Sequence, residues 1–210
     1  MTFVYRFTWW ICRILFGTYF RWRVHNPENV PIEGPVILAS NHASFLDPPL
    51  IGSAIPRPIN YLARESLFRA PLVGTYFRAL NSVPVDRDGA GAKGLKMILN
   101  RLLGGGGIIL FPEGTRTSDD KLQPARSGVG LTVIKSTAPV VPVRVFGTFQ
   151  AWNRKMIIPR PRRVQVRYGE VMEFRELREE AKTCDKKRLK IIYQEVADQI
   201  MAEIGKLSVG

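Results

Sequence analysis

His42 and Asp47 have the residue types and the spacing of a proton-transfer pair. Both lie in the segment NHASFLD, residues 41–47, which follows an apolar run at 36–40. Because five positions of a helix are about 140° apart, the two side chains meet only if His42 lies in a loop and Asp47 in the first turn of the next helix. The carboxylate would then fix the imidazole tautomer and leave the other ring nitrogen free to take a proton. The alternative is structural, with His42 closing a turn and Asp47 capping a helix.

A second polar segment follows another apolar run and is suited to binding an anion. In FPEGTRT, residues 111–117, the planar guanidinium of Arg116 can hold a phosphate through two charge-assisted hydrogen bonds. The hydroxyl of Thr115 adds a donor, and Gly114 permits a close approach of the backbone. The alternatives are that Glu113 braces the loop and that Arg116 is a solvated arginine of an ordinary turn.

Arg87 occupies a comparable place after a third apolar run, in VPVDR at 83–87. Ligands of parallel sheets gather beyond the carboxyl ends of the strands, so two arginines in such places suggest basic groups that converge on one ligand. A contact between Asp86 and Arg87 within the loop is the alternative.

Other chemistries have weaker support. Ser44 stands in no GxSxG turn, so a loop hydroxyl is a simpler interpretation than a nucleophile. His25 and His42 lack the spacing of metal ligands, and the sequence has no acidic cluster, so we expect no metal. Cys12 and Cys184 are far apart, which argues against a disulfide framework and favours a reducing, cytoplasmic environment.

Apolar, β-rich runs alternate with helical segments along the chain, as they do in α/β folds. The predicted strands lie at 36–40, 59–63, 81–85, 107–111, 139–146 and 163–170. The predicted helices follow Asp47 and cover about 66–80, 90–103 and 129–135, and a last long helix has apolar residues at 189, 192, 196, 200 and 204. Strands joined through helices require crossover connections, so we predict a largely parallel central sheet flanked by helices.

Residues 3–20 form an aromatic, apolar segment that contains Arg6 and Arg13. Each arginine would cost roughly 2.5 to 3.5 kcal/mol at a bilayer centre, so a clean membrane span is disfavoured. Seven positions bring Arg6 and Arg13 to nearly the same helical angle, so we expect a charged stripe on an amphipathic helix that lies in the membrane interface. A helix docked on the protein's own core is the alternative. We predict two parts: residues 1–24 as a membrane-associated helix and residues 25–210 as a single α/β domain.

The composition is that of a folded protein with basic character. The 210 residues include 45% hydrophobic and 23% charged residues, which excludes a disordered chain and a many-span transporter. Thirty-one Lys and Arg against 18 Asp and Glu give a formal net charge of +13, which favours phosphate-rich partners such as nucleic acid, anionic lipid or phosphorylated metabolites. Six of the basic residues lie between 154 and 167, and no acidic residue lies between 151 and 167.

The ordered set NHASFLD, VPVDR, FPEGTR and VVPVR resembles the 1-acylglycerol-3-phosphate acyltransferase family of glycerolipid synthesis. The resemblance covers about residues 25–170, and the combination of NHxxxxD with FPEGTR is specific. It implies transfer of a fatty acyl group from a coenzyme A or acyl-carrier-protein thioester to the free hydroxyl of 1-acylglycerol 3-phosphate, which gives phosphatidic acid. It also implies that no cofactor is needed beyond the thioester, and that the partners are a lysophospholipid and the anionic cytoplasmic face of the cell membrane, not nucleic acid.

The resemblance assigns roles to single residues. His42 and Asp47 would be the catalytic pair, and Pro142 belongs to the fourth motif. The residues implied to bind the phosphate of the acceptor are Arg87, Glu113, Gly114, Thr115 and Arg116.

Two positions depart from the family's pattern. Arg64 stands where a lysine is common, before Glu65 and Ser66, and Thr117 stands where serine is frequent. These departures leave the proposed chemistry intact and concern substrate preference.

Two functions of other classes remain open. A nonenzymatic protein that binds anionic membranes or nucleic acid would explain the basic cluster, but the sequence has no aromatic stacking set of the kind that RNA-binding modules use. A phosphoester hydrolase would explain the arginines, but a histidine paired with an early Asp, without a nucleophile or a metal, fits activation of a hydroxyl better. Within the family, another lysolipid or glycerol phosphate is the alternative acceptor.

Overall fold

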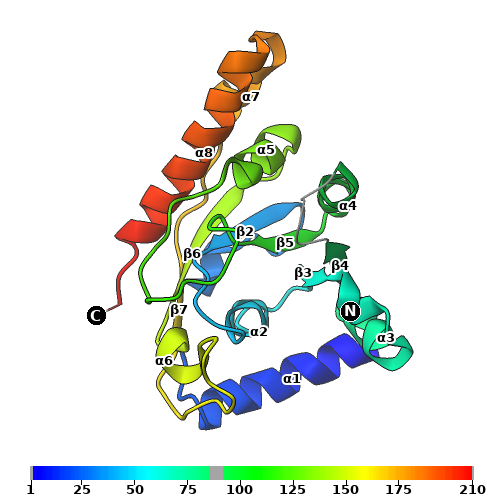
Figure 1. Cartoon of the computed structure of the whole chain (residues 1–210), viewed down its shortest axis with the longest axis vertical. Coiled ribbons are helices and arrows are strands. Elements are labelled where there is room, and N and C mark those ends of the chain that lie inside the picture. Colours follow the sequence, from blue (N-terminus) through cyan, green and yellow to red (C-terminus); the bar gives the residue numbers. More distant parts are fainter. Residues whose placement is uncertain (1, 86–91, 210) are drawn as a thin grey trace.

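A seven-stranded sheet forms the centre of the computed structural model, which describes residues 2–85 and 92–209 (Figure 1). The strands β6, β2, β5, β3 and β4 run parallel to one another, whereas β7 runs antiparallel to β6 and parallel to β1. The predicted α/β class and largely parallel sheet are therefore confirmed. Across the sheet, the order is β1 (Arg23–His25), β7 (Gln165–Tyr168), β6 (Val140–Phe146), β2 (Val36–Ser40), β5 (Gly107–Leu110), β3 (Ile59–Arg64) and β4 (Ser82–Val85).

Helices cover both faces of the sheet and enclose two apolar cores (Figure 1). One core lies between the sheet and the helices α1 (Phe3–Thr18), α2 (Asp47–Ser53) and α6 (Thr148–Trp152). The other core lies under α4 (Ala92–Leu103), α5 (Ser127–Lys135), α7 (Arg175–Thr183) and α8 (Lys186–Lys206). The remaining helices are α3 (Pro71–Ala79) and the short 3-10 helices η1 (Pro27–Asn29) and η2 (Glu65–Phe68).

The residue patterns explain why these elements form. All five residues of β2 are buried, which is the continuous apolar run expected of a strand covered on both faces. In α8, Ile192, Val196, Ile200 and Ile204 recur every four residues and are fully buried against the sheet. The predicted last helix and its apolar face are confirmed.

Helix α1 has two different apolar faces. Its inner face buries Tyr5 and Phe16, and Phe16 joins the core beside α2. The guanidinium of Arg13 lies over the rings of Trp9 and Trp22 and donates to the Ser53 carbonyl at 3.0 Å. The side chain of Arg13 therefore has partners on the protein, namely aromatic rings and a carbonyl at the end of α2. The interfacial placement of the helix stays a prediction. The predicted division of the chain after residue 24 stays a prediction.

The predicted helix at 66–80 is divided in the structure. η2 covers Glu65–Phe68 and α3 begins at Pro71, with Ala70 in an extended conformation between them. A residue that precedes proline avoids the helical region, whereas proline itself suits the first position of a helix. The other predicted strands and helices are found with shifts of a few residues at their ends, and β1, α6 and α7 were not predicted.

The topology places one edge of the sheet where the polar segments of the sequence meet. Strands β2, β5 and β3 are parallel neighbours, so their carboxyl ends at Ser40, Leu110 and Arg64 lie along the same edge. His42 follows the first of these ends, and the segment 111–117 follows the second.

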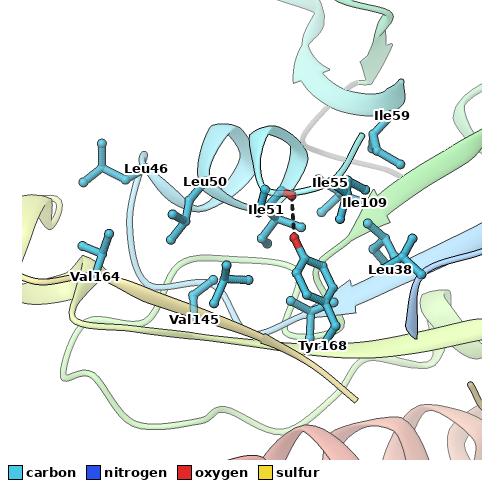
Figure 2. Packing of buried hydrophobic residues seen from close by; sticks show 14 of the residues in the cluster. Leu38, Leu46, Leu50, Ile51, Ile55, Ile59, Ile109, Val145, Val164 and Tyr168 are labelled. Carbon is cyan, nitrogen blue, oxygen red and sulfur yellow. Dashed lines mark hydrogen bonds between the residues drawn. The ribbon is translucent and has the colours of Figure 1, made fainter. Parts of the chain in front are cut away.

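Tyr168 on β7 links the core to α2, the helix that begins with Asp47, and its substitution measures what this link contributes to stability. Its ring is fully buried, and its hydroxyl donates to the Ile51 carbonyl in α2 at 2.7 Å (Figure 2). We expect Tyr168→Phe to lower the free energy of unfolding by about 1 to 3 kcal/mol, because the buried carbonyl loses its donor. Denaturant unfolding measures the change. The same substitution at the half-buried Tyr193 is the control, and equal losses in both variants would contradict the assigned bond.

Candidate functional site

His42 and Asp47 meet in the geometry that their spacing requires. His42 lies in the loop after β2, and Asp47 is the first residue of α2. The Nδ1 atom of His42 and the Oδ2 atom of Asp47 are 2.8 Å apart. The same Oδ2 accepts hydrogen bonds from the backbone N–H groups of Ala43 and Ser44, each at 2.7 Å. The fully buried carboxylate therefore holds both the imidazole and the loop that carries it.

The bond to Asp47 leaves the second nitrogen of His42 available for chemistry. An ionised carboxylate only accepts hydrogen bonds, so Nδ1 carries the proton and Nε2 has a free lone pair. The ring stacks on Phe111 with centroids 3.8 Å apart, and 18% of the side chain is exposed. The imidazole is thus fixed in orientation and still reachable by a substrate.

Glu113 holds the backbone of His42 and not its ring. Its Oε1 accepts the backbone N–H of His42 at 2.9 Å, and its Oε2 accepts the backbone N–H of Gln123 at 3.3 Å. The backbone N–H of Thr117 donates to the carbonyl of His42 at 2.8 Å. Burial raises the pKa of Glu113 to about 7. With both carboxyl oxygens occupied in this way, the geometry supports a positioning role for Glu113 more than direct contact with a phosphate; the brace reaches beyond its own loop to His42.

Arg116 lies at the centre of a small basic group. Its guanidinium stacks on Phe45 at 3.5 Å from the ring centroid. The guanidinium of Arg154 donates to the Thr115 hydroxyl at 2.6 Å and to the Arg116 carbonyl. Burial, followed by the nearby charges of Arg154 and Arg64, lowers the pKa of Arg116. Crowded guanidinium groups of this kind favour an anion between them.

A cleft of about 750 Å³ connects the imidazole with this basic group. His42, Phe45, Arg64 and Arg116 line it, and the remaining walls come from α1, α2, β3, η2, α3 and the start of β4. Most of those wall residues are aromatic or aliphatic, among them Trp9, Leu62, Leu67, Tyr76 and Phe77. The cleft can take a long apolar group whose polar end lies beside His42 and the arginines.

The other predicted site residues have separate outcomes. Gly114 has a φ of +70°, and a Cβ there would lie 2.9 Å from Cδ of Arg126, so the position suits glycine. Pro142 pairs with Ala39 next to the carboxyl end of β2. Arg87 lies outside the described residues. The hydroxyl of Ser44 is fully buried and donates to the Trp152 carbonyl at 2.6 Å, which supports the loop interpretation.

Two features of the site were not predicted from the sequence. Arg154 was noted as part of a basic cluster, but its contact with Thr115 joins segments that are 39 residues apart. The hold of Glu113 on the His42 backbone spans 71 residues. Within residues 2–85 and 92–209, no group of three or more His, Cys, Asp and Glu side chains is placed to bind a metal ion.

Comparison with known proteins finds a matching family and similar proteins. The model of the family described as Acyltransferase matches residues 21–146. The chain is 31% identical to a 1-acyl-sn-glycerol-3-phosphate acyltransferase of Bacillus subtilis over 66% of this chain and 72% of that relative. It is 29% identical to the protein of the same description from Cocos nucifera, over 72% of this chain, and spans about half of that relative, 52%.

A solved structure extends the similarity to the fold. It is the 1-acyl-sn-glycerophosphate acyltransferase PlsC from Thermotoga maritima, which superposes with a TM-score of 0.74 at 25% sequence identity. The match covers 98% of this chain and 81% of that protein.

Glu113→Gln tests whether the buried carboxyl contributes to stability in the way its environment indicates. Because its pKa rises from an ordinary 4.5 to about 7 on folding, the folded protein binds this proton more tightly than the unfolded chain. The contribution is fully present below the ordinary pKa and is lost as the pH rises through the folded pKa. We therefore expect the melting temperature of the wild type to fall relative to Glu113→Gln as the pH is raised from roughly 5 to 8.

A melting series at increasing pH measures this effect, with Glu65→Gln at an exposed position as the control. Parallel curves for the wild type and Glu113→Gln would show that Glu113 does not titrate on folding.

Proposed function

This chain belongs to the acyltransferase family that includes the 1-acyl-sn-glycerol-3-phosphate acyltransferases, and from that membership we propose its reaction. The protein transfers a fatty acyl group from an acyl thioester to the free hydroxyl of 1-acylglycerol 3-phosphate and produces phosphatidic acid. One observation carries the proposal: the His42–Asp47 pair lies where an apolar cleft meets Arg64 and Arg116. The cleft suits a long acyl chain, the His42–Asp47 pair suits a hydroxyl, and the two arginines suit a phosphate.

In the proposed reaction, Nε2 of His42 takes the proton of the acceptor hydroxyl. The oxygen attacks the thioester carbonyl and forms the new C–O bond, while Asp47 stabilises the imidazolium that results. The C–S bond then breaks, and the thiolate leaves with the proton that His42 returns. The hydroxyl of the acceptor is the nucleophile, so no acyl-enzyme forms and the buried Ser44 has no chemical role.

The remaining groups of the site bind and orient the acceptor in this proposal. Arg116 and Arg64 hold its phosphate, and Arg154 keeps the segment 115–116 in place. The acyl chain lies along the cleft between α1 and α3. The donor is acyl-CoA or acyl-carrier protein, which acts as a co-substrate, and no other cofactor takes part.

We place the reaction at the cytoplasmic face of the cell membrane, because the acceptor is a lipid. The outer face of α1 exposes a set of large apolar residues: Phe3, Phe7, Trp10, Ile11, Ile14 and Leu15. This pattern supports a helix that lies in the membrane interface. No helix in the described part of the chain has both the length and the hydropathy of a membrane crossing.

His42→Ala tests the assigned base. We expect transfer to fall by a factor of about 10² to 10⁴, because the substitution removes the proton acceptor. Asp47→Asn is expected to lose nearly as much, since Nδ1 of His42 then loses its charged partner. The measurement is transfer of a labelled acyl chain from a thioester to 1-acylglycerol 3-phosphate.

His25→Ala is the matched control, because this histidine lies on β1 and contacts Gln165 away from the cleft. The assignment fails if His42→Ala keeps wild-type turnover, or if His25→Ala loses as much.

Arg116→Ala tests the assigned phosphate contact. Loss of a charge-assisted hydrogen bond costs about 1.5 to 3 kcal/mol, so we expect KM for 1-acylglycerol 3-phosphate to rise about ten- to hundredfold. Monoacylglycerol, which lacks the phosphate, is expected to change little. Steady-state kinetics with both acceptors measure the difference, and Arg101→Ala on the exposed side of α4 is the control. Equal losses for the two acceptors would remove Arg116 from the phosphate site.

A further inference from the structure

The segment after α6 presents two isoleucines to solvent. We call residues 153–163 the isoleucine loop. Within it, Ile157 is 92% exposed and Ile158 is 74% exposed, and neither belongs to either core. Single exposed apolar residues are ordinary on protein surfaces, whereas contiguous exposed apolar residues mark surfaces that bind a partner, and these two are adjacent in the chain.

The isoleucine loop is held in place by hydrogen bonds at both ends. The indole N–H of Trp152 donates to the Met156 carbonyl at 3.0 Å, and the N–H of Met156 donates to the Asn153 carbonyl at 3.2 Å. The N–H of Arg160 donates to the Ala151 carbonyl at 2.8 Å. The fold therefore presents the two isoleucines in a defined place.

The isoleucine loop lies next to the carboxyl-terminal end of α1 (Figure 1). The hydroxyl of Tyr19 donates to the Pro159 carbonyl at 2.9 Å and joins the two segments. The loop with the two exposed isoleucines thus adjoins α1, whose outer face also exposes apolar residues. A flat apolar partner that covers α1 also reaches the loop.

The charges around the two isoleucines identify the partner. The same loop carries five exposed basic residues on both sides of them in the sequence: Arg154, Lys155, Arg160, Arg162 and Arg163. No acidic residue lies between 151 and 167. Apolar side chains that enter the acyl boundary, with cations at the level of the phosphates, match an anionic lipid surface.

We propose that the isoleucine loop is a second membrane-binding element, which inserts Ile157 and Ile158 into an anionic bilayer beside α1. This inference rests on the proposed action at a membrane and adds a contact that α1 alone does not make. At the start of the loop, Arg154 bonds to the Thr115 hydroxyl and the Arg116 carbonyl. Insertion of the loop therefore sets the height of the lipid phosphates relative to Arg116.

The experiment compares vesicle binding of the full chain with that of Ile157→Ser/Ile158→Ser. Serine removes the apolar side chains without a change of charge, so electrostatic attraction stays the same. We expect binding to mixed phosphatidylcholine and phosphatidylglycerol vesicles to weaken by at least about tenfold. The difference in vesicle binding between the wild type and the double variant is expected to persist in high salt. Salt screens the attraction between the basic residues and the anionic lipid, but it does not weaken apolar insertion.

Two further variants make the result specific. Leu103→Ser changes an exposed apolar residue at the end of α4, on the other side of the sheet, and is expected to bind as the wild type does. Ile14→Ser on the outer face of α1 is expected to weaken binding independently of the loop variant. Thermal melting of each variant checks that the fold is kept.

Wild-type vesicle binding by the double variant, or an equal loss in Leu103→Ser, would overturn the proposal. If the double variant bound vesicles normally but changed oligomeric state, the loop would belong to an interface between copies of the chain. Transfer to a soluble short-chain acceptor is expected to be unchanged in the double variant. Because vesicle binding is measured without substrate, a chain that bound vesicles through the loop but transferred no acyl group would contradict only the proposed reaction.

Discussion

The buried carboxylate of Asp47 is the constraint on which the rest of the site depends. A fully buried charge requires hydrogen-bond donors, and here they are the His42 ring and the backbone N–H groups of Ala43 and Ser44. These donors all belong to the loop that carries the imidazole, so the loop cannot change shape without leaving the charge unpaired. Tyr168 supports the helix that begins with Asp47 from the opposite side, through the Ile51 carbonyl. The core thereby fixes the position of a group at the edge of the sheet.

A second segment adds a different kind of support. Residues 111–117 hold the backbone of His42 on both sides, through the Glu113 carboxyl and the Thr117 N–H. The same segment carries Arg116 beside the cleft. Because one piece of chain contacts His42 and presents Arg116, the separation between the proposed base and the proposed phosphate contact is built into the fold. Such a fixed distance suits an acceptor in which hydroxyl and phosphate are separated by a short glycerol unit.

The sequence predicted what depends on local pattern. The strand at 36–40, the loop position of His42 and the first-turn position of Asp47 follow from apolar runs and helical spacing, and the structure contains all three. Contacts between segments that are distant in the sequence could not be predicted from local pattern. The side chain of Arg13 turns toward Trp9, Trp22 and the Ser53 carbonyl, which helical angle alone does not reveal. α7 was not predicted because its residues are mostly charged and none is buried. Its sequence therefore lacks the periodic apolar residues from which a helix is predicted.

The pairing of β1 with β7 has a consequence for how the chain is made. Arg23 lies opposite Gln165, so the first strand finds its sheet neighbour only after most of the chain has been synthesised. The hydrogen bond that the Phe20 carbonyl accepts also forms late, because its donor is the Val164 N–H. Domains emerge from the ribosome with the amino terminus first, and contacts of long sequence separation form late. During synthesis, α1 can pack on α2 early, but the core that it joins lacks its residues of β6 and β7 until late. A nascent chain of this kind can meet a membrane or a chaperone before that core is complete.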